Sequence, residues 1–218
     1  MSKPFVYPWH RVKPYKLYPV ILVVMRILAP IVYDFRVVGR ENLPESASGM
    51  LLACNHLKAA DPAFLMAATR LRWRFMGKAE LFEKKLPALL YTHCNSFPIR
   101  RGTVDRRALD YALEAMREGS YGLGIFPEGT RSPDGKPQEP KSGIAMFARR
   151  MRADVLPCSV YFEGKLKFRS RLTVRIGKVI PFEELNLSDA PNKCQTRAAC
   201  EKIMASITDL WKQGHDNA

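Results

Sequence analysis

Short apolar runs alternate with longer amphipathic stretches along most of the chain, and this alternation predicts an α/β fold. The short runs are rich in β-branched and aromatic residues and end at turn-forming residues, as strands do. They cover residues 35–39, 50–55, 72–78, 121–127, 154–162 and 172–180, with a further strand-like piece at 97–99. The stretches at 62–69, 103–117, 141–150 and 191–211 predict helices. The pattern favours a single mixed sheet flanked by helices.

The longest apolar segment, residues 17–33, lies near the N-terminus. Three basic residues precede it: Arg11, Lys13 and Lys16. A membrane-spanning helix needs about 20 mostly apolar residues, whereas this segment is shorter and carries Arg26 in its middle. We therefore expect a helical appendage that lies in the membrane interface, and a buried amphipathic helix is the alternative. The expected organisation is a membrane-associating segment at 1–34 and a larger domain at 35–218.

The charge balance is strongly basic, with 35 Lys and Arg against 21 Asp and Glu in 218 residues. A net charge of +14 indicates a negatively charged partner, which can be nucleic acid, anionic lipid or a phosphorylated substrate. The five cysteines form no CxxC pair, which is typical of free thiols in a reducing compartment rather than of disulfides or a zinc site. No signal peptide is apparent, and we expect the working part of the protein to face the cytosol.

The segment CNHLKAADPAF, residues 54–64, places a histidine and an aspartate between two apolar runs. On a regular helix His56 and Asp61 would point about 140° apart, so we expect a strand, a tight loop and a helix that Asp61 caps and Pro62 begins. The loop then brings the carboxylate to the imidazole, at a strand end where ligands usually bind. Such a pair can accept a proton from an attacking hydroxyl group. The alternative is a capping aspartate beside a satisfied histidine at a sheet edge.

The segment FPIRRGT, residues 97–103, has features of an anion-binding site. Arg100 and Arg101 follow a short strand, and Gly102 and Thr103 open the next predicted helix. Two guanidinium groups beside the free N–H groups of a helix start suit a phosphate group. A solvated basic turn is the alternative interpretation.

The segment IFPEGTRS, residues 125–132, ends another strand with a glycine turn. Gly129 lets the backbone approach a ligand closely, Arg131 can bind a phosphate, and Glu128 can accept hydrogen bonds from hydroxyl groups. A fourth segment, VLPCSV at 155–160, predicts an apolar strand. Its Pro157 predicts a place at a sheet edge, where the strand would line an apolar pocket or only pack in the core.

In this order the four segments resemble the motifs of the glycerolipid acyltransferases that acylate lysophosphatidic acid. NHLKAAD is similar to the NHxxxxD (HX4D) block of that family, FPIRR and FPEGTRS resemble its second and third blocks, and VLPCSV is a looser match to its fourth. The likeness covers residues 35–180. Two positions depart from it, because Asn95 stands where the second block has a glycine and Cys158 replaces a commoner valine.

The resemblance implies that the protein transfers a fatty acyl group from an acyl carrier protein (ACP) or coenzyme A thioester to the sn-2 hydroxyl of 1-acyl-glycerol 3-phosphate, which gives phosphatidic acid. His56 would be the base and Asp61 the residue that orients it. The implied substrate-binding residues are Arg100, Arg101, Glu128, Gly129, Thr130 and Arg131, with Asn55 and Lys141 as further candidates. The resemblance implies no metal and no bound cofactor.

Two alternatives remain open. An acyltransferase of the same superfamily can use another acceptor, such as glycerol 3-phosphate or an amino-lipid. A basic nucleic-acid-binding protein is the second alternative, although Lys and Arg are dispersed and no recognised nucleic-acid-binding module is present. The expected partners are therefore lysophosphatidic acid, an acyl thioester and an anionic membrane surface, with no nucleic acid. We expect a peripheral or monotopic position on the cytoplasmic face of the cell membrane.

Overall fold

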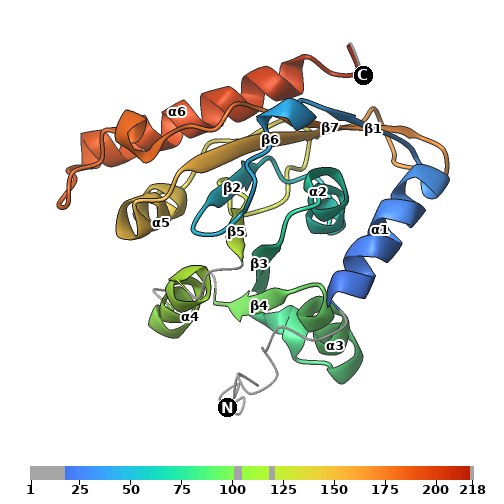
Figure 1. Cartoon of the computed structure of the whole chain (residues 1–218), viewed down its shortest axis with the longest axis horizontal. Coiled ribbons are helices and arrows are strands. Elements are labelled where there is room, and N and C mark those ends of the chain that lie inside the picture. Colours follow the sequence, from blue (N-terminus) through green and yellow to red (C-terminus); the bar gives the residue numbers. More distant parts are fainter. Residues whose placement is uncertain (1–17, 101–104, 118–120, 217–218) are drawn as a thin grey trace.

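The computed structural model describes residues 18–100, 105–117 and 121–216. Within these residues, seven strands form one sheet in the order β1-β7-β6-β2-β5-β3-β4. Neighbouring strands are parallel except β6 and β7, which are antiparallel. The predicted fold class, a single mixed sheet flanked by helices, is therefore confirmed (Figure 1).

The bounds of the elements agree with most of the predicted ranges. The strands are β1 (Asp34–Val38), β2 (Leu51–Cys54), β3 (Trp73–Lys78), β4 (Ser96–Ile99), β5 (Gly122–Ile125), β6 (Val155–Tyr161) and β7 (Arg171–Ile176). The α-helices are α1 (Tyr18–Val32), α2 (Asp61–Thr69), α3 (Lys85–His93), α4 (Arg106–Arg117), α5 (Gly143–Met151) and α6 (Lys193–Lys212). The described residues also form the short 3-10 helices η2 (Arg40–Asn42), η3 (Ala79–Phe82) and η4 (Phe182–Leu185). The sequence pattern did not predict α3, because the exposed leucines of this helix do not mark a face that packs on the core.

Helices cover both faces of the sheet. Figure 1 shows α1, α2 and α3 on one face and α4, α5 and α6 on the other. Successive residues of β2 point to opposite faces, so Leu51 and Ala53 join the core under α4, α5 and α6, while Leu52 and Cys54 join the core under α1 and α2. Burial of β2 on both faces explains why this strand reads as one continuous apolar run. All five cysteines are free, as expected.

Helix α1 has one packed face and one apolar face that is open to solvent. Tyr18 and Leu22 are buried, and the guanidinium of Arg26 donates to the carbonyl of Arg70 at the C-terminal end of α2 (3.1 Å). The outer face exposes Val20, Val23, Val24, Ile27, Leu28 and Ile31. Among the described helices, none combines the length and the apolarity that crossing a membrane would require. The division into 1–34 and 35–218 stays a prediction, and the basic residues expected before α1 lie outside the described residues.

Strand β6 is an inner strand, so the prediction that Pro157 marks a sheet edge is wrong. β6 lies between β7 and β2. The carbonyl of Pro157 accepts a hydrogen bond from the N–H of Gly177 (2.8 Å), one residue beyond the end of β7. Proline has no N–H group to donate. No hydrogen bond of the ladder between β6 and β7 is lost, however, because that ladder ends at Ile176.

Substituting Gly124 by alanine is expected to destabilise the fold. A Cβ atom at Gly124 would overlap the ring of Phe75 on the neighbouring strand β3. Overpacking of this kind lowers the free energy of unfolding by about 1–3 kcal/mol, which denaturant unfolding would measure. Gly143→Ala is the matched control, because a Cβ atom there meets nothing within 4 Å. Equal stability of the wild type and Gly124→Ala would contradict the packing of β5 on β3.

Candidate active site

The loop that joins β2 to α2 brings His56 and Asp61 into contact. Nδ1 of His56 lies 2.8 Å from Oδ2 of Asp61. The carboxylate is fully buried, and the imidazole side chain is 11% exposed. Since Nδ1 is engaged by the carboxylate, Nε2 is the ring nitrogen that remains for a substrate. The geometry therefore meets the first requirement of a proton-accepting pair.

Asp61 does not cap α2, so this part of the prediction is wrong. The helix begins at Asp61 itself, and Ala60 occupies the N-cap position without a side-chain hydrogen bond. Oδ2 of Asp61 instead accepts hydrogen bonds from the main-chain N–H groups of Leu57 (2.6 Å) and Lys58 (2.8 Å). These two donors precede the helix and turn the carboxylate back towards the loop. The same oxygen atom thus fixes the loop and the imidazole together.

Asn55 holds the start of this loop against β6. Its side-chain amide donates to the carbonyl of Val160 (3.0 Å) and accepts from the N–H of Val160 (2.9 Å). The main-chain pairing of β2 with β6 ends one residue earlier, at Cys54, so the amide extends the ladder by a side chain. Asn55 is fully buried and supports the loop that carries His56, while its contact with a substrate stays a prediction.

The segment after β5 supports His56 from the other side. Oε1 of Glu128 accepts from the main-chain N–H of His56 (3.2 Å), and the N–H of Ser132 donates to the carbonyl of His56 (2.7 Å). Phe126 stacks on the imidazole, with ring centroids 4.0 Å apart and planes 16° apart. Phe126 was not among the predicted site residues, although it belongs to the quoted segment IFPEGTRS. Its role depends on the pairing of β2 with β5, which the local sequence does not reveal.

Burial raises the pKa of the Glu128 carboxyl from an ordinary 4.5 to about 7, and the negative charge of Asp61 acts in the same direction. The side chain is 2% exposed. A carboxyl group in this position supports the main chain of His56, as the hydrogen bond shows. Its predicted contact with the glycerol of a substrate stays a prediction.

Two hollows meet at His56, and His56, Met76 and Phe126 line both of them. The first, of about 320 Å³, is also lined by Arg100, Gly129 and Lys141. The second, of about 260 Å³, contains Arg131 and Lys78 beside an apolar wall. That wall includes Ala59, Pro62, Phe75, Leu81 and Tyr91.

The hollows separate residues that the sequence analysis had grouped together. Arg100 and Arg131, both expected to bind the substrate, line different hollows, and His56 lines both of these hollows. Thr130 is exposed, and Arg101 lies outside the described residues. Cations therefore line both hollows, and the binding of a substrate phosphate by Arg100 and Arg131 stays a prediction.

Lys141 lies directly over the glycine turn. Gly129 has a φ of +72°, and a Cβ atom there would lie 3.0 Å from Cδ of Lys141. The N–H of Lys141 donates to the carbonyl of Pro127 (2.8 Å), which fixes the lysine main chain on this turn. Glycine is thus favoured at this position both by the left-handed backbone and by the space that the lysine occupies.

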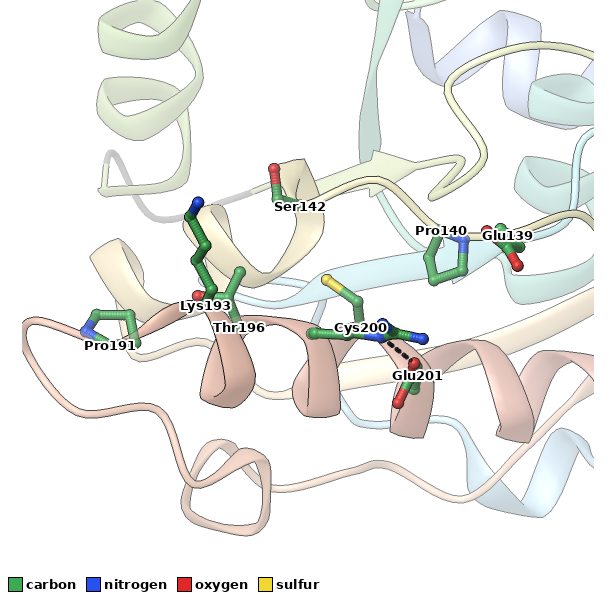
Figure 2. Close-up of a pocket in the computed structure, with 9 residues that line it drawn as sticks. Glu139, Pro140, Ser142, Pro191, Lys193, Thr196, Cys200 and Glu201 are labelled. Carbon is green, nitrogen blue, oxygen red and sulfur yellow. Dashed lines mark hydrogen bonds and ion pairs between the residues drawn. The ribbon is translucent and has the colours of Figure 1, made fainter.

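A larger hollow, of about 520 Å³, lies between the 139–142 segment and the first turns of α6 (Figure 2). Arg197 and Glu201 on its wall pair with each other at 2.6 Å. Burial raises the pKa of the Cys200 thiol, and a thiol of this kind is a weak nucleophile. Volume alone therefore does not identify the reactive site, whereas the His56–Asp61 contact does.

Replacing Glu128 by glutamine is expected to change how stability depends on pH. The folded carboxyl has a pKa of about 7 against an ordinary 4.5, so it favours folding when protonated, and this contribution is lost as the pH rises through that window. Glutamine cannot ionise, so the free energy of unfolding of Glu128→Gln should fall less over the same window, by on the order of 2 kcal/mol. Denaturant unfolding of both proteins at about pH 5 and about pH 8 measures the difference. The same pH dependence in both proteins would contradict the burial of this carboxyl.

The comparisons with known proteins agree with this geometry. A family model described as Acyltransferase matches residues 34–161, which is more than half of the chain. A 1-acyl-sn-glycerol-3-phosphate acyltransferase of Bacillus subtilis is 27% identical over 179 residues, which cover 80% of this chain and 87% of the relative. The enzyme of the same name from Borreliella burgdorferi is 26% identical over 181 residues, which cover 80% of this chain and 72% of the relative.

A solved structure shares the fold. The 1-acyl-sn-glycerophosphate (LPA) acyltransferase PlsC from Thermotoga maritima superposes with a TM-score of 0.67 at 22% sequence identity. The match covers 89% of this chain and 81% of that structure. With the family match extending from the start of β1 to the end of β6, through the loop that holds His56 and Asp61 and the turn after β5, the chain belongs to the acyltransferase family.

Proposed function

We propose that this protein transfers a fatty acyl group from a thioester to the sn-2 hydroxyl of 1-acyl-glycerol 3-phosphate and so forms phosphatidic acid. The observation that carries the proposal is the 2.8 Å contact of His56 with Asp61 where two cation-lined hollows meet, in a chain of the acyltransferase family. The names of the relatives support this acceptor.

The reaction starts with the imidazole as a base. Asp61 accepts the hydrogen bond of Nδ1–H, so Nε2 carries the lone pair that takes the proton of the acceptor hydroxyl. The hydroxyl oxygen attacks the thioester carbonyl, the C–S bond breaks, and the leaving thiolate takes the proton from the imidazolium. Asp61 stabilises the imidazolium between these two steps. Because the acceptor oxygen itself attacks the carbonyl, the sequence of steps needs no acyl-enzyme, no metal and no resident cofactor.

The two hollows fit the two substrates of this reaction. We assign the phosphate of the acceptor to Arg131, because more apolar side chains line its hollow than line the other one, and lysophosphatidic acid carries both a phosphate and an acyl chain. Arg100 and Lys141 then lie on the donor side of His56. Both candidate donors, acyl-ACP and acyl-coenzyme A, carry a phosphate on the thiol-bearing arm, which a cation in this position can bind.

The outer face of α1 fits a membrane surface. Six exposed aliphatic side chains lie on this single helix, including Ile27 and Ile31, which are 56% and 55% exposed. The acceptor and the product both carry fatty acyl chains and reside in a bilayer. We therefore propose that α1 lies in the interface of an anionic membrane at its cytoplasmic face, so that the enzyme is peripheral or monotopic.

Purified protein is expected to form phosphatidic acid from 1-acyl-glycerol 3-phosphate with an acyl-ACP or an acyl-coenzyme A donor, as measured by mass spectrometry of the products. His56→Ala should lose roughly 10²–10⁴-fold or more in turnover without losing its fold, and Asp61→Asn should also be severely impaired. His93→Ala, which removes a histidine of α3, is the matched control. Near wild-type turnover of His56→Ala would refute the base, and a preference for glycerol 3-phosphate or an amino-lipid would refute the acceptor.

Arg131→Lys is expected to raise the KM for the acceptor and to leave the KM for the donor nearly unchanged. Lysine keeps the charge but cannot reproduce the planar, bidentate contact of a guanidinium group with phosphate. Arg100→Lys is the matched comparison on the other side of His56, and its main effect should be on the donor. Steady-state kinetics with each substrate varied in turn measures both. If Arg100→Lys and Arg131→Lys raise the acceptor KM equally, both arginines bind one phosphate and the assignment of the two hollows is wrong.

A further inference from the structure

The turn between β6 and β7 combines an exposed aromatic ring with basic side chains. Residues 163–171 read EGKLKFRSR. Phe168 is 74% exposed, although it is a large apolar side chain. The three basic residues around it are also exposed: Lys165, Lys167 and Arg169. The proposed reaction does not use any of these side chains.

Hydrogen bonds fix the shape of this turn. The N–H of Ser170 donates to the carbonyl of Lys167 (3.0 Å), and the N–H of Lys167 donates to Oγ of Ser170 (2.9 Å). Phe168 and Arg169 therefore form the tip. Arg169 has a φ of +62°, a left-handed conformation in which glycine or asparagine is more stable than arginine. The tip thus carries a basic side chain at a position that the backbone would favour for glycine.

The turn is attached to the C-terminal end of α1. The main-chain N–H of Arg169 donates to the carbonyl of Val32 (2.7 Å), and its guanidinium donates to the carbonyl of Pro30 (3.3 Å). Figure 1 shows the connection from β6 to β7 beside this end of α1. The exposed aliphatic face of α1, which includes Ile31, and the exposed ring of Phe168 therefore belong to adjoining elements.

The carboxylates near the turn leave its charge positive. Asp34 pairs with Arg36 (2.7 Å) and with Arg171 (3.0 Å), so that two cations surround this carboxylate. Glu163, at the start of the turn, lies 3.4 Å from the hydroxyl of Tyr161. Against these two acidic groups, the turn presents Lys165, Lys167 and Arg169 in addition to the two arginines that bind Asp34.

The position of the turn in the sheet relates it to the active site. β2 and β6 are parallel, so the turn after β6 lies at the same end of the strands as the loop that carries His56. A surface bound at Phe168 therefore lies at the same end of the strands as the loop that carries His56.

We propose that the turn formed by residues 165–169 is a second membrane contact, with a preference for anionic lipid. Phe168 enters the interface beside the apolar face of α1, while Lys165, Lys167 and Arg169 bind the phosphate groups of anionic lipids. An exposed aromatic residue among cations, continuous with an apolar helix face, has the chemistry of an anionic bilayer surface. The inference rests on the proposed membrane position of α1 and adds a lipid preference and an orientation to it.

Binding to vesicles tests the inference with substitutions that spare the fold. The assay is cosedimentation of the full chain with phosphatidylcholine vesicles, with and without phosphatidylglycerol. Arg169→Gly loses the guanidinium bond to Pro30 but keeps the main-chain bond to Val32 and suits the left-handed backbone, so its stability should be close to that of the wild type, while its affinity for the anionic vesicles should fall roughly 5-fold. Phe168→Ala should weaken binding to both kinds of vesicle, and Phe168→Trp should restore it.

Arg152→Gly is the matched control. Arg152 is also exposed and left-handed, with a φ of +47°, but it ends α5 on the opposite face of the sheet. The Arg152→Gly protein should bind anionic vesicles as the wild type does. Equal loss of binding in Arg152→Gly and Arg169→Gly would show a general charge effect and overturn the inference.

Further outcomes separate this inference from the proposals on which it rests. If Ile27→Glu on α1 loses binding while Phe168→Ala and Arg169→Gly bind as the wild type does, the turn is not a contact and α1 alone binds the membrane. If the wild type binds neither kind of vesicle, both membrane proposals fail, and acyl transfer to a detergent-dispersed acceptor still tests the reaction. If the turn variants keep vesicle binding but lose affinity for ACP, the turn binds a protein and the inference is wrong.

Discussion

The buried carboxylate of Asp61 is the group on which the geometry of the site depends. One of its oxygen atoms accepts hydrogen bonds from Leu57, from Lys58 and from the imidazole of His56. Loss of this acceptor would leave two main-chain donors of the loop unsatisfied, which is costly in a buried position. In the proposed mechanism, the interaction that orients the base is therefore also the one that shapes the loop, so that catalysis and local folding depend on the same oxygen atom.

The two strands beside β2 hold the rest of the site in place. Asn55 ties the start of the loop to β6, and from the segment after β5 Glu128 accepts from the N–H of His56 while Ser132 donates to its carbonyl. Phe126 covers the face of the imidazole. A base whose main chain and ring are fixed by packing and hydrogen bonds needs little reorganisation when it accepts a proton, which is the general condition for an efficient site.

Basic side chains lie both in the hollows beside His56 and on an exposed turn beside α1. Arg131 and Lys141 line hollows beside His56, where a cation can bind a phosphate of a substrate. Arg169 is at the tip of an exposed turn beside α1, at the same end of the strands as the loop that carries His56. On our proposals, the turn that contacts the membrane and the loop that carries the base therefore lie at the same end of the parallel strands.

Local sequence pattern was enough to predict the strands, most of the helices and the pairing of His56 with Asp61, because each depends on residues within a few positions of one another. Helix α3 was missed because its leucines are exposed, whereas the inner position of Pro157 and the support of His56 by Glu128 depend on which strands are neighbours. Arg131 and Lys141 likewise line hollows beside His56 only because β2 lies beside β5. Local pattern identifies the residues at the end of each strand, whereas the order of the strands comes from long-range packing, and this order decides which side of the base each residue reaches.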